Sequence, residues 1–346
     1  MTTALPLADR VTLKHGAGGR AMRRLIEEVF LDTAPPRDPR VLIGPCAMDD
    51  GAALKLGDEW LVVTTDSHVV QPIFFPGGDI GRLAISGTVN DLAVMGATEV
   101  LALTCAVVIE EGFARADLAR VRDSMRSACI EAGADILTGD TKVMGRGEID
   151  GLILNTTGIG LAGRVVSDAG LKPDDVLIVT GTIGDHGLAV MAARHDLGFE
   201  AALRSDVAPI NGLVRAALEA GGDEVVAMKD PTRGGLASTL HEMAVKSGVS
   251  IVIDEARIPI APEVRAAVEV LGIDPLYVAN EGKAVIGVRA DAAERVLTAL
   301  RGHPHGRYAA AIGTCRAERP GTLVLDTGFG RRLVPEPEGE PLPRIC

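Results

Sequence analysis

The chain has 346 residues, a net charge of −12, 47% hydrophobic residues and only 3% aromatic residues. This length suggests two domains of ordinary size, with cores built from Ala, Val, Leu and Ile. The acidic balance argues against nucleic acid or an anionic membrane surface as the main partner, because both attract clustered Lys and Arg. No apolar run approaches the ~20 residues that span a bilayer, and no signal peptide is evident.

The first half alternates helix-like and strand-like segments. A compact glycine loop at 14–20 leads into a predicted helix at 21–30, and the periodicity predicts two further helices and several strands. The β-rich runs lie at 60–67, 100–109, 135–144 and 151–162, and the helical stretches between them lie at 79–97 and 115–134.

The second half repeats this pattern. A strand at 174–184 runs into a glycine turn, a helix is predicted at 186–198, and further strands are predicted at 250–254, 284–290 and 322–326. The pattern breaks between Arg164 and Pro173, which favours a domain boundary there. We therefore predict an α/β (α+β) architecture in two comparable domains, 1–165 and 166–332, followed by a flexible tail at 333–346.

The tail ends in PEPEGEPLPRIC, from Pro335 to Cys346, and has no period of 2 or 3.6. In polyproline II geometry, at about 3.1 Å per residue, it could reach roughly 40 Å. That reach would carry a terminal thiol across a domain face or into a neighbouring subunit.

The five cysteines are widely spaced and include no CxxC pair, so zinc is not expected. Their odd number does not suggest a disulfide framework, which favours a reducing, cytoplasmic location. Cys105 lies in an apolar run and is predicted to be a buried small hydrophobe. The full set is Cys46, Cys105, Cys129, Cys315 and Cys346.

Several aspartates lie where strands meet turns. Each one alone is well explained as a cap or turn former, and Asp230 before Pro231 looks like a helix N-cap. Together, many oxygen donors with few His or Cys neighbours suit Mg²⁺ held by carboxylates and nucleotide phosphates. The candidate metal ligands are Asp49, Asp50, Asp66, Asp91 and Asp140.

The glycine loop KHGAGGR is a candidate phosphate cradle, because backbone N–H groups at a loop–helix junction bind anions. A simple turn explains the loop equally well. It is neither a P-loop nor a Rossmann fingerprint. The candidate nucleotide-binding residues are His15, Gly16, Gly18, Gly19, Asp50, Asp66, Asn90, Asp91, Asp140 and Asp230.

The order of these motifs resembles the HypE family of hydrogenase maturation factors. The matching segments are HGAGG, DDGA, the long block from Thr64 to Ala97, TGDTKVM, GTIGDHG, DPTRGG, NEGKA and the terminal PRIC. The resemblance covers essentially the whole chain, and the long block and the last four residues are its most specific parts. It implies the two-domain fold of AIR synthase (PurM), in which strands of the N-terminal domain pair with a second subunit in a homodimer.

The resemblance also implies an activity. Members of this family receive a carbamoyl group on the C-terminal cysteine from the carbamoyltransferase HypF. They use ATP to dehydrate the S-carboxamide to an S-cyanide. The cyanide then passes to iron held by the HypC–HypD complex, for the [NiFe] hydrogenase centre. The expected cofactors are ATP and Mg²⁺.

Three residues are the candidate catalytic groups on this basis. Cys346 would carry the substrate, Lys142 would polarise the oxygen that accepts phosphate, and Glu281 would act as the base. Lys142 could equally pair with Asp140, and Glu281 could be a turn residue. Two other functions stay open: a small-molecule kinase or synthetase of the same superfamily, and a non-enzymatic carrier.

Overall fold

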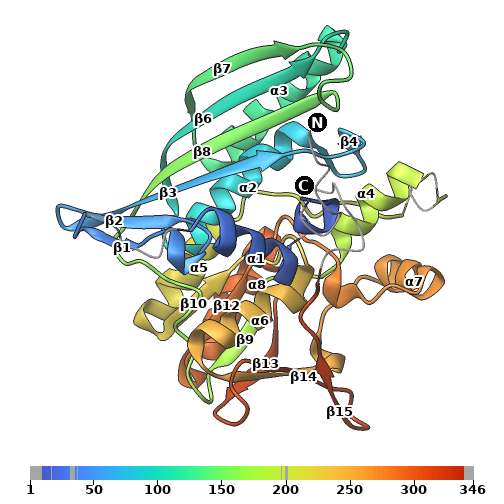
Figure 1. Cartoon of the computed structure of the whole chain (residues 1–346). Helices are drawn as coiled ribbons and strands as arrows, with labels where there is room; N and C mark the ends of the chain where they lie inside the picture. Colours follow the sequence, from blue (N-terminus) through green and yellow to red (C-terminus); the bar gives the residue numbers. More distant parts are fainter. Residues whose placement is uncertain are drawn as a thin grey trace, which may run out of the picture.

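The structure is a computed structural model that describes residues 10–16, 18–31, 36, 38–195, 197–198 and 202–338. Within this part the chain forms two α/β halves, each built on its own large sheet (Figure 1). The predicted fold class, with two halves, is therefore confirmed. No helix in the described part is both long enough and apolar enough to cross a bilayer.

The first sheet has six strands, and only β6 and β7 run parallel. Helix α3 (Arg115–Ala132) forms the crossover between these two strands, as a parallel pair requires. Helix α2 (Ile80–Val94) packs beside α3 on one face of the sheet (Figure 1). In order across the sheet the strands are β1 (Val41–Ile43), β2 (Ala52–Leu56), β3 (Glu59–His68), β8 (Leu152–Ala162), β6 (Glu99–Glu110) and β7 (Ile136–Met144).

Helix α2 is the most buried helix of the first half. A small hairpin of β4 (Phe74–Phe75) and β5 (Gly78–Asp79) precedes it, and the Asp79 carboxylate accepts two backbone N–H groups of its first turn. Its glycines allow close packing. A Cβ at Gly81 would lie 2.5 Å from a carbonyl oxygen of α3, and one at Gly87 would lie 2.9 Å from the His68 ring.

The second sheet has seven strands, and helices cover parts of both faces. Helix α6 (Gly235–Ser247) packs on one face, and α5 (Asn211–Gly221) and α8 (Ala293–Gly302) pack on the other. Helices α4 (Asp185–His195) and α7 (Pro262–Leu271) lie to one side (Figure 1). The strand order is β10 (Val225–Lys229), β12 (Val285–Val288), β9 (Val176–Val179), β13 (Ala310–Arg316), β11 (Ser250–Asp254), β14 (Leu323–Asp326) and β15 (Arg331–Val334).

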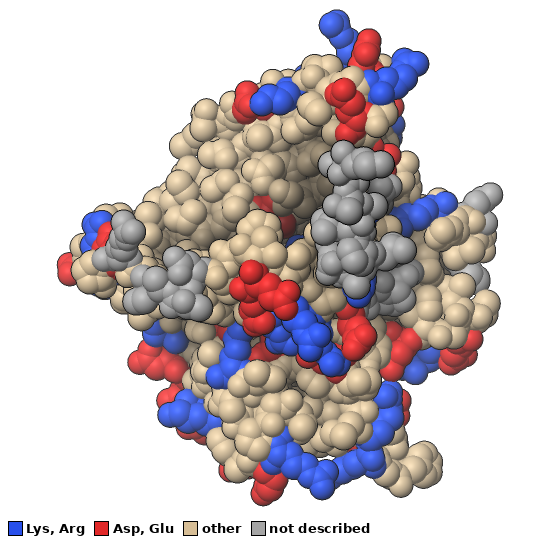
Figure 2. Space-filling view, viewed as in Figure 1, with Lys and Arg blue, Asp and Glu red and all other residues tan. Residues whose placement is uncertain are grey.

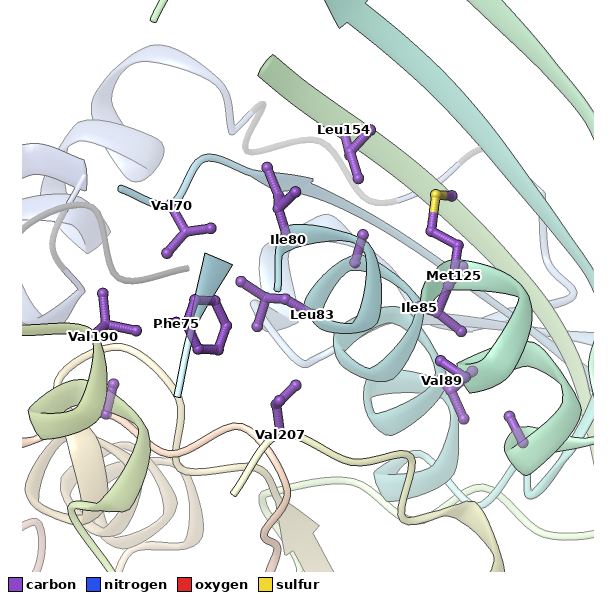
Figure 3. Close-up of a cluster of buried hydrophobic side chains, with 14 of the residues drawn as sticks. Val70, Phe75, Ile80, Leu83, Ile85, Val89, Met125, Leu154, Val190 and Val207 are labelled. Carbon is purple, nitrogen blue, oxygen red and sulfur yellow. The ribbon is translucent and has the colours of Figure 1, made fainter. Parts of the chain in front are cut away.

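One hydrophobic core joins the two halves. Phe75 and Leu83 come from the first half, whereas Val190 of α4 and Val207 come from the second, and all four belong to one buried cluster. Figure 3 shows these side chains gathered around Phe75. Because interior packing is dense, the two halves hold a fixed relative position and the cleft between them is well defined.

Part of the first sheet is uncovered in the single chain. Strand β7 is exposed along nearly its whole length, and Leu101, Leu137 and Val143 are 44%, 67% and 65% exposed. Figure 2 shows the hollowed, largely uncharged surface of this sheet. Apolar side chains of this size on one edge are typical of a surface that another chain covers.

The chain leaves the second sheet later than expected. Strand β15 continues to Val334, which is buried against the core, so the predicted start of the tail at residue 333 lies inside a strand. Residues 335–338 are also described and contact the folded body. Cys346 and the rest of 339–346 lie outside the described residues.

Asn90 fastens α2 to the second half. Its amide nitrogen donates to the backbone carbonyls of Ala208 and Glu281, at 3.1 and 2.8 Å, and its oxygen accepts from the Ile210 N–H at 2.8 Å. The side chain is only 1% exposed. Asn90 therefore bonds to backbone of the second half, and its predicted nucleotide-binding role stays a prediction.

We predict that Asn90→Ala lowers the free energy of unfolding by about 2–4 kcal/mol, because three buried backbone groups lose their partner. Urea unfolding of the apo protein measures this change. Asn155→Ala is the matched control, since Asn155 is partly exposed and bonds within the first sheet. A loss at Asn90 no larger than that of the control contradicts the interpretation.

Candidate functional site

A cavity of about 980 Å³ lies between the two halves. The first half supplies α1 (Gly19–Val29), the turn at 45–50, the end of β3 and one face of α2. The second half supplies the end of β10 and the segment after it, one face of α6 and the turn before β12. A cleft of this size between two packed domains is a common place for a small-molecule site.

Among the carboxylates that line this cavity, four come from distant parts of the sequence and have clearly raised pKa values. They are Asp50, Asp91, Asp230 and Glu281. Burial raises the pKa of Asp50 to about 6, against the opposing charge of Lys229. Burial, and then repulsion among these carboxylates, raises the pKa values of the other three well above their usual range.

Lys229 partly compensates this charge, although it is not among the residues predicted from the sequence. Its Nζ lies 2.5 Å from Asp50 Oδ1, 3.4 Å from Asp168 Oδ2 and 3.5 Å from Glu242 Oε2. Burial alone would lower the pKa of Lys229, but the surrounding carboxylates raise it well above its usual value. Its position was the one indication in the sequence, because Lys229 directly precedes the predicted residue Asp230.

Lys246 closes the same network on the side of α6. Its Nζ donates to Asp168 Oδ2 and to the backbone carbonyl of Met48, both at 2.7 Å. Asp49 belongs here as well, since its two oxygens accept the backbone N–H groups of Asp50 and Asp168. The network ties the 45–50 turn of the first half to the second half.

Two buried oxygens in the cavity have no hydrogen-bond partner within the described part of the chain. They are Asp50 Oδ2 and Glu281 Oε1. No group of three or more described His, Cys, Asp and Glu side chains forms a metal site on its own. The cavity therefore has acidic groups with unused oxygens, without a complete set of protein ligands.

The glycine loop lies at the rim of the cavity. Gly18 and Gly19 line it and have φ angles of +79° and +69°, which favour glycine. A Cβ at Gly18 would also lie 2.9 Å from the carbonyl oxygen of Arg233. His15 and Gly16, at the start of the loop, lie in a short 3₁₀ turn and are not among the residues that line the cavity.

The cavity therefore collects most of the predicted nucleotide and metal residues, but not all of them. Asp140 and Lys142 lie on β7, which is an extended strand as predicted, at the exposed edge of the first sheet and away from this cavity. Cys346 lies outside the described residues. The predicted residues that line the cavity are Gly18, Gly19, Asp49, Asp50, Asp66, Asp91, Asp230 and Glu281.

The prediction that Asp230 is a helix N-cap is wrong. Helix α6 begins at Gly235 and its N-cap is Gly234, because these two residues have φ angles of +80° and +62° and form a tight turn. Asp230 lies before this turn, and its backbone carbonyl accepts the Thr239 hydroxyl at 3.2 Å. Its carboxylate is therefore free to face the cavity.

Comparison with known protein families shows first to which class of proteins this chain belongs. Residues 48–162 match the N-terminal domain of AIR synthase related proteins, and residues 172–326 match their C-terminal domain. The first region contains every strand of the first sheet except β1, and the second contains every strand of the second sheet except β15. The chain is thus a two-domain protein of the AIR synthase-related, or PurM-like, type.

Relatives that match over nearly the full length identify the family within this class. The carbamoyl dehydratase HypE of Azotobacter vinelandii is 47% identical over 341 residues, which cover 97% of each chain. A crystal structure of a HypE–HypF complex matches with 44% identity and a TM-score of 0.83, covering 90% of this chain and 99% of that one. One of HypE in complex with ATP matches with 40% identity and a TM-score of 0.79, covering 97% and 100%. The chain belongs to the HypE family.

We predict that Asp91→Asn stabilises the nucleotide-free protein at pH 7.5 by roughly 1 kcal/mol, because it removes a buried charge from the carboxylate cluster. The pKa of Asp91 is raised in the folded state, so ionisation destabilises the fold as pH rises. The gain should therefore shrink as pH falls towards the ordinary carboxyl range, because the folded and unfolded states then bind the same number of protons.

Scanning calorimetry without nucleotide measures this difference. Asp58→Asn is the matched control, because Asp58 is exposed in the turn between β2 and β3. If Asp91→Asn melts no higher than the wild type at pH 7.5, mutual repulsion in the cluster is not a significant destabilising force.

Proposed function

We propose that this chain is an ATP-dependent carbamoyl dehydratase that acts in hydrogenase maturation. It converts an S-carbamoyl group on Cys346 into an S-cyanide, which supplies the cyanide ligand of the [NiFe] hydrogenase iron. The observation that carries this proposal is the buried carboxylate cluster beside the glycine loop, in a chain 47% identical over nearly its full length to a carbamoyl dehydratase HypE. ATP would bind in the 980 Å³ cavity, and a HypE similar to this chain has a crystal structure in complex with ATP.

The cavity residues fit a divalent cation that arrives with the nucleotide. Mg²⁺ usually takes one or two carboxylates and completes its shell with phosphate oxygens and water. Asp50, Asp66 and Asp91 would hold it, and the unused Asp50 oxygen is the best-placed donor. When bound, the ion would neutralise charge on the phosphates. Asp49 is less suitable, since backbone N–H groups already occupy both of its oxygens.

The chemistry proceeds by activation of a poor leaving group. The thiocarbamate oxygen attacks the γ-phosphorus, the bond to the β-phosphate oxygen breaks, and ADP leaves. The nitrogen loses one proton as this phosphorylated intermediate forms. Loss of inorganic phosphate, together with the second nitrogen proton, then gives the S–C≡N group.

Glu281 is the proposed base for these protons. It lines the cavity, is 3% exposed and has an oxygen without a hydrogen-bond partner in the described part of the chain. Burial and the neighbouring Asp230 and Asp66 raise its pKa well above the usual range. A carboxylate with raised proton affinity suits a general base that works near neutral pH.

Lys142 would reach the site from a second subunit. It lies on β7, outside the cavity of its own chain, next to exposed apolar side chains that a homodimer would cover. Pairing of two uncovered first sheets would bring β7 of one protomer towards the cavity of the other. Lys142 then polarises the oxygen that accepts phosphate, and Asp140 adds a carboxylate to the metal site.

Two further partners follow from the function. A HypF-type carbamoyltransferase loads Cys346, as the crystal structure of a relative's HypE–HypF complex suggests. A HypC–HypD-type complex receives the cyanide for its iron. All of these partners would meet the protein in the cytoplasm, where a thiol persists in reduced form.

Intact mass spectrometry tests the reaction. The carbamoylated chain should lose the mass of one water when ATP and Mg²⁺ are added, and Glu281→Gln should slow this loss by about 100-fold or more. ATP turnover that survives deletion of residues 345–346 would indicate a small-molecule kinase. A carbamoylated chain that keeps its mass would indicate a carrier.

Subunit mixing tests the role of Lys142. Lys142→Ala and Glu281→Gln should each be inactive alone. Random exchange into mixed dimers should restore about a quarter of the wild-type sites, because one site of each mixed dimer has both groups intact. No recovery after demonstrated subunit exchange would place Lys142 in the site of its own chain, whereas full activity of Lys142→Ala alone would place it outside the reaction.

A further inference from the structure

Helix α1 lines the mouth of the cavity but has little core of its own. Gly19 is its one buried residue, and Val29 and Phe30 at its far end are 62% and 74% exposed. Its described long-range contacts with the rest of the molecule therefore determine where it lies. Figure 1 shows α1 in front of the second sheet, between the two halves.

The chain just after β15 supplies several of these contacts. The backbone N–H of Arg20 donates to the carbonyl oxygen of Pro337 at 3.0 Å. The Arg23 guanidinium forms a close ion pair with Glu336. Arg20 adds ion pairs of 3.8 Å to Glu336 and 3.7 Å to Glu338. In Figure 2 basic and acidic side chains gather side by side in the region of α1.

The same segment is fixed on its other side to the second half. A ring nitrogen of His241, on α6, donates to the carbonyl oxygen of Val334 at 2.6 Å. The Tyr277 hydroxyl donates to the carbonyl oxygen of Pro335 at 3.0 Å. Residues 334–338 therefore bridge two bodies, with the second half behind them and α1 in front.

The fit between the segment and α1 requires glycine. A Cβ at Gly19 would lie 2.3 Å from the carbonyl oxygen of Pro337, a distance that no side chain tolerates. Gly19 therefore packs against Pro337 and also lines the cavity. One residue of the glycine loop touches both the nucleotide cavity and the base of the tail.

We propose that residues 334–338 are a latch that holds α1 over the cavity, so that binding of a nucleoside triphosphate and seating of the tail base favour each other. Arg20 and Arg23 are the positioning residues of α1, and Glu336 and Glu338 are their partners. The inference rests on the proposed function, in which the terminal cysteine carries the reacting group. Linkage makes the effect reciprocal: a latched α1 strengthens nucleotide binding, and bound nucleotide strengthens the latch.

The latch also shortens the tail that carries Cys346, because the tail then starts after residue 338. The eight residues from Gly339 to Cys346 span at most about 28 Å when fully extended, compared with the roughly 40 Å expected for a tail that starts at 333. A shorter tether from a fixed point raises the effective concentration of its end near the cavity, provided that it can reach.

Charge reversal from the side of the tail tests the latch without changing a cavity residue. In Glu336→Arg/Glu338→Arg, amide hydrogen exchange over residues 19–29 of the full chain, without nucleotide, should accelerate about threefold to tenfold. Affinity for a fluorescent ATP analogue should fall by a similar factor. The matched control is Arg24→Glu, because Arg24 is exposed on the same helix and has no ion pair among the described residues.

A second variant, in which the charges of the two partners are exchanged, provides a further test. Adding Arg20→Glu/Arg23→Glu to the tail variant should restore slow exchange of α1, because the ion pairs re-form with opposite sign. Unchanged α1 exchange in the tail variant, or failure of the combined variant to restore it, overturns the latch even where the carbamoylated wild type loses water with ATP. Accelerated and rescued exchange supports the latch even where that water loss is not seen.

Discussion

The structure depends on how it holds several buried carboxylates in one cavity. Asp50, Asp91, Asp230 and Glu281 come from four separate segments, and their pKa values are all raised by burial. Lys229 offsets part of the charge, and two carboxylate oxygens have no partner in the described part of the chain. Such an arrangement opposes folding and persists because the surrounding packing enforces it. A ligand that brings positive charge to these oxygens relieves the strain.

The rest of the fold serves this cavity. The shared core around Phe75 and the hydrogen bonds of Asn90 fix the two halves, so that the carboxylates cannot move apart. In the homodimer that we propose, the uncovered first sheet would bind a second subunit, which would contribute β7. The segment after Val334 connects α1 with the second half, so the arm that we propose carries the substrate starts at the edge of the same cavity.

Much of this site was predictable from aspartates at the ends of strands, since such residues collect at one edge of a sheet. A single sequence does not show which side chains are buried or what surrounds them. The sequence gives no sign that Lys229 is surrounded by carboxylates, or that Asn90 bonds to three backbone groups of the second half. Lys142 lies outside the cavity of its own chain, so its predicted role depends on the second subunit that we propose. The ion pair between Arg23 and Glu336 joins residues 313 apart, with no local pattern to indicate it.

The most direct measurement is the number of protons released when ATP and Mg²⁺ bind together. Titration calorimetry near pH 6.5, in buffers with different ionisation enthalpies, gives this number. The account predicts a release on the order of one proton per chain, because a bound cation lowers raised carboxylate pKa values such as that of Asp50, about 6. Binding without proton release, or with proton uptake, would show that the buried carboxylates do not receive the cation.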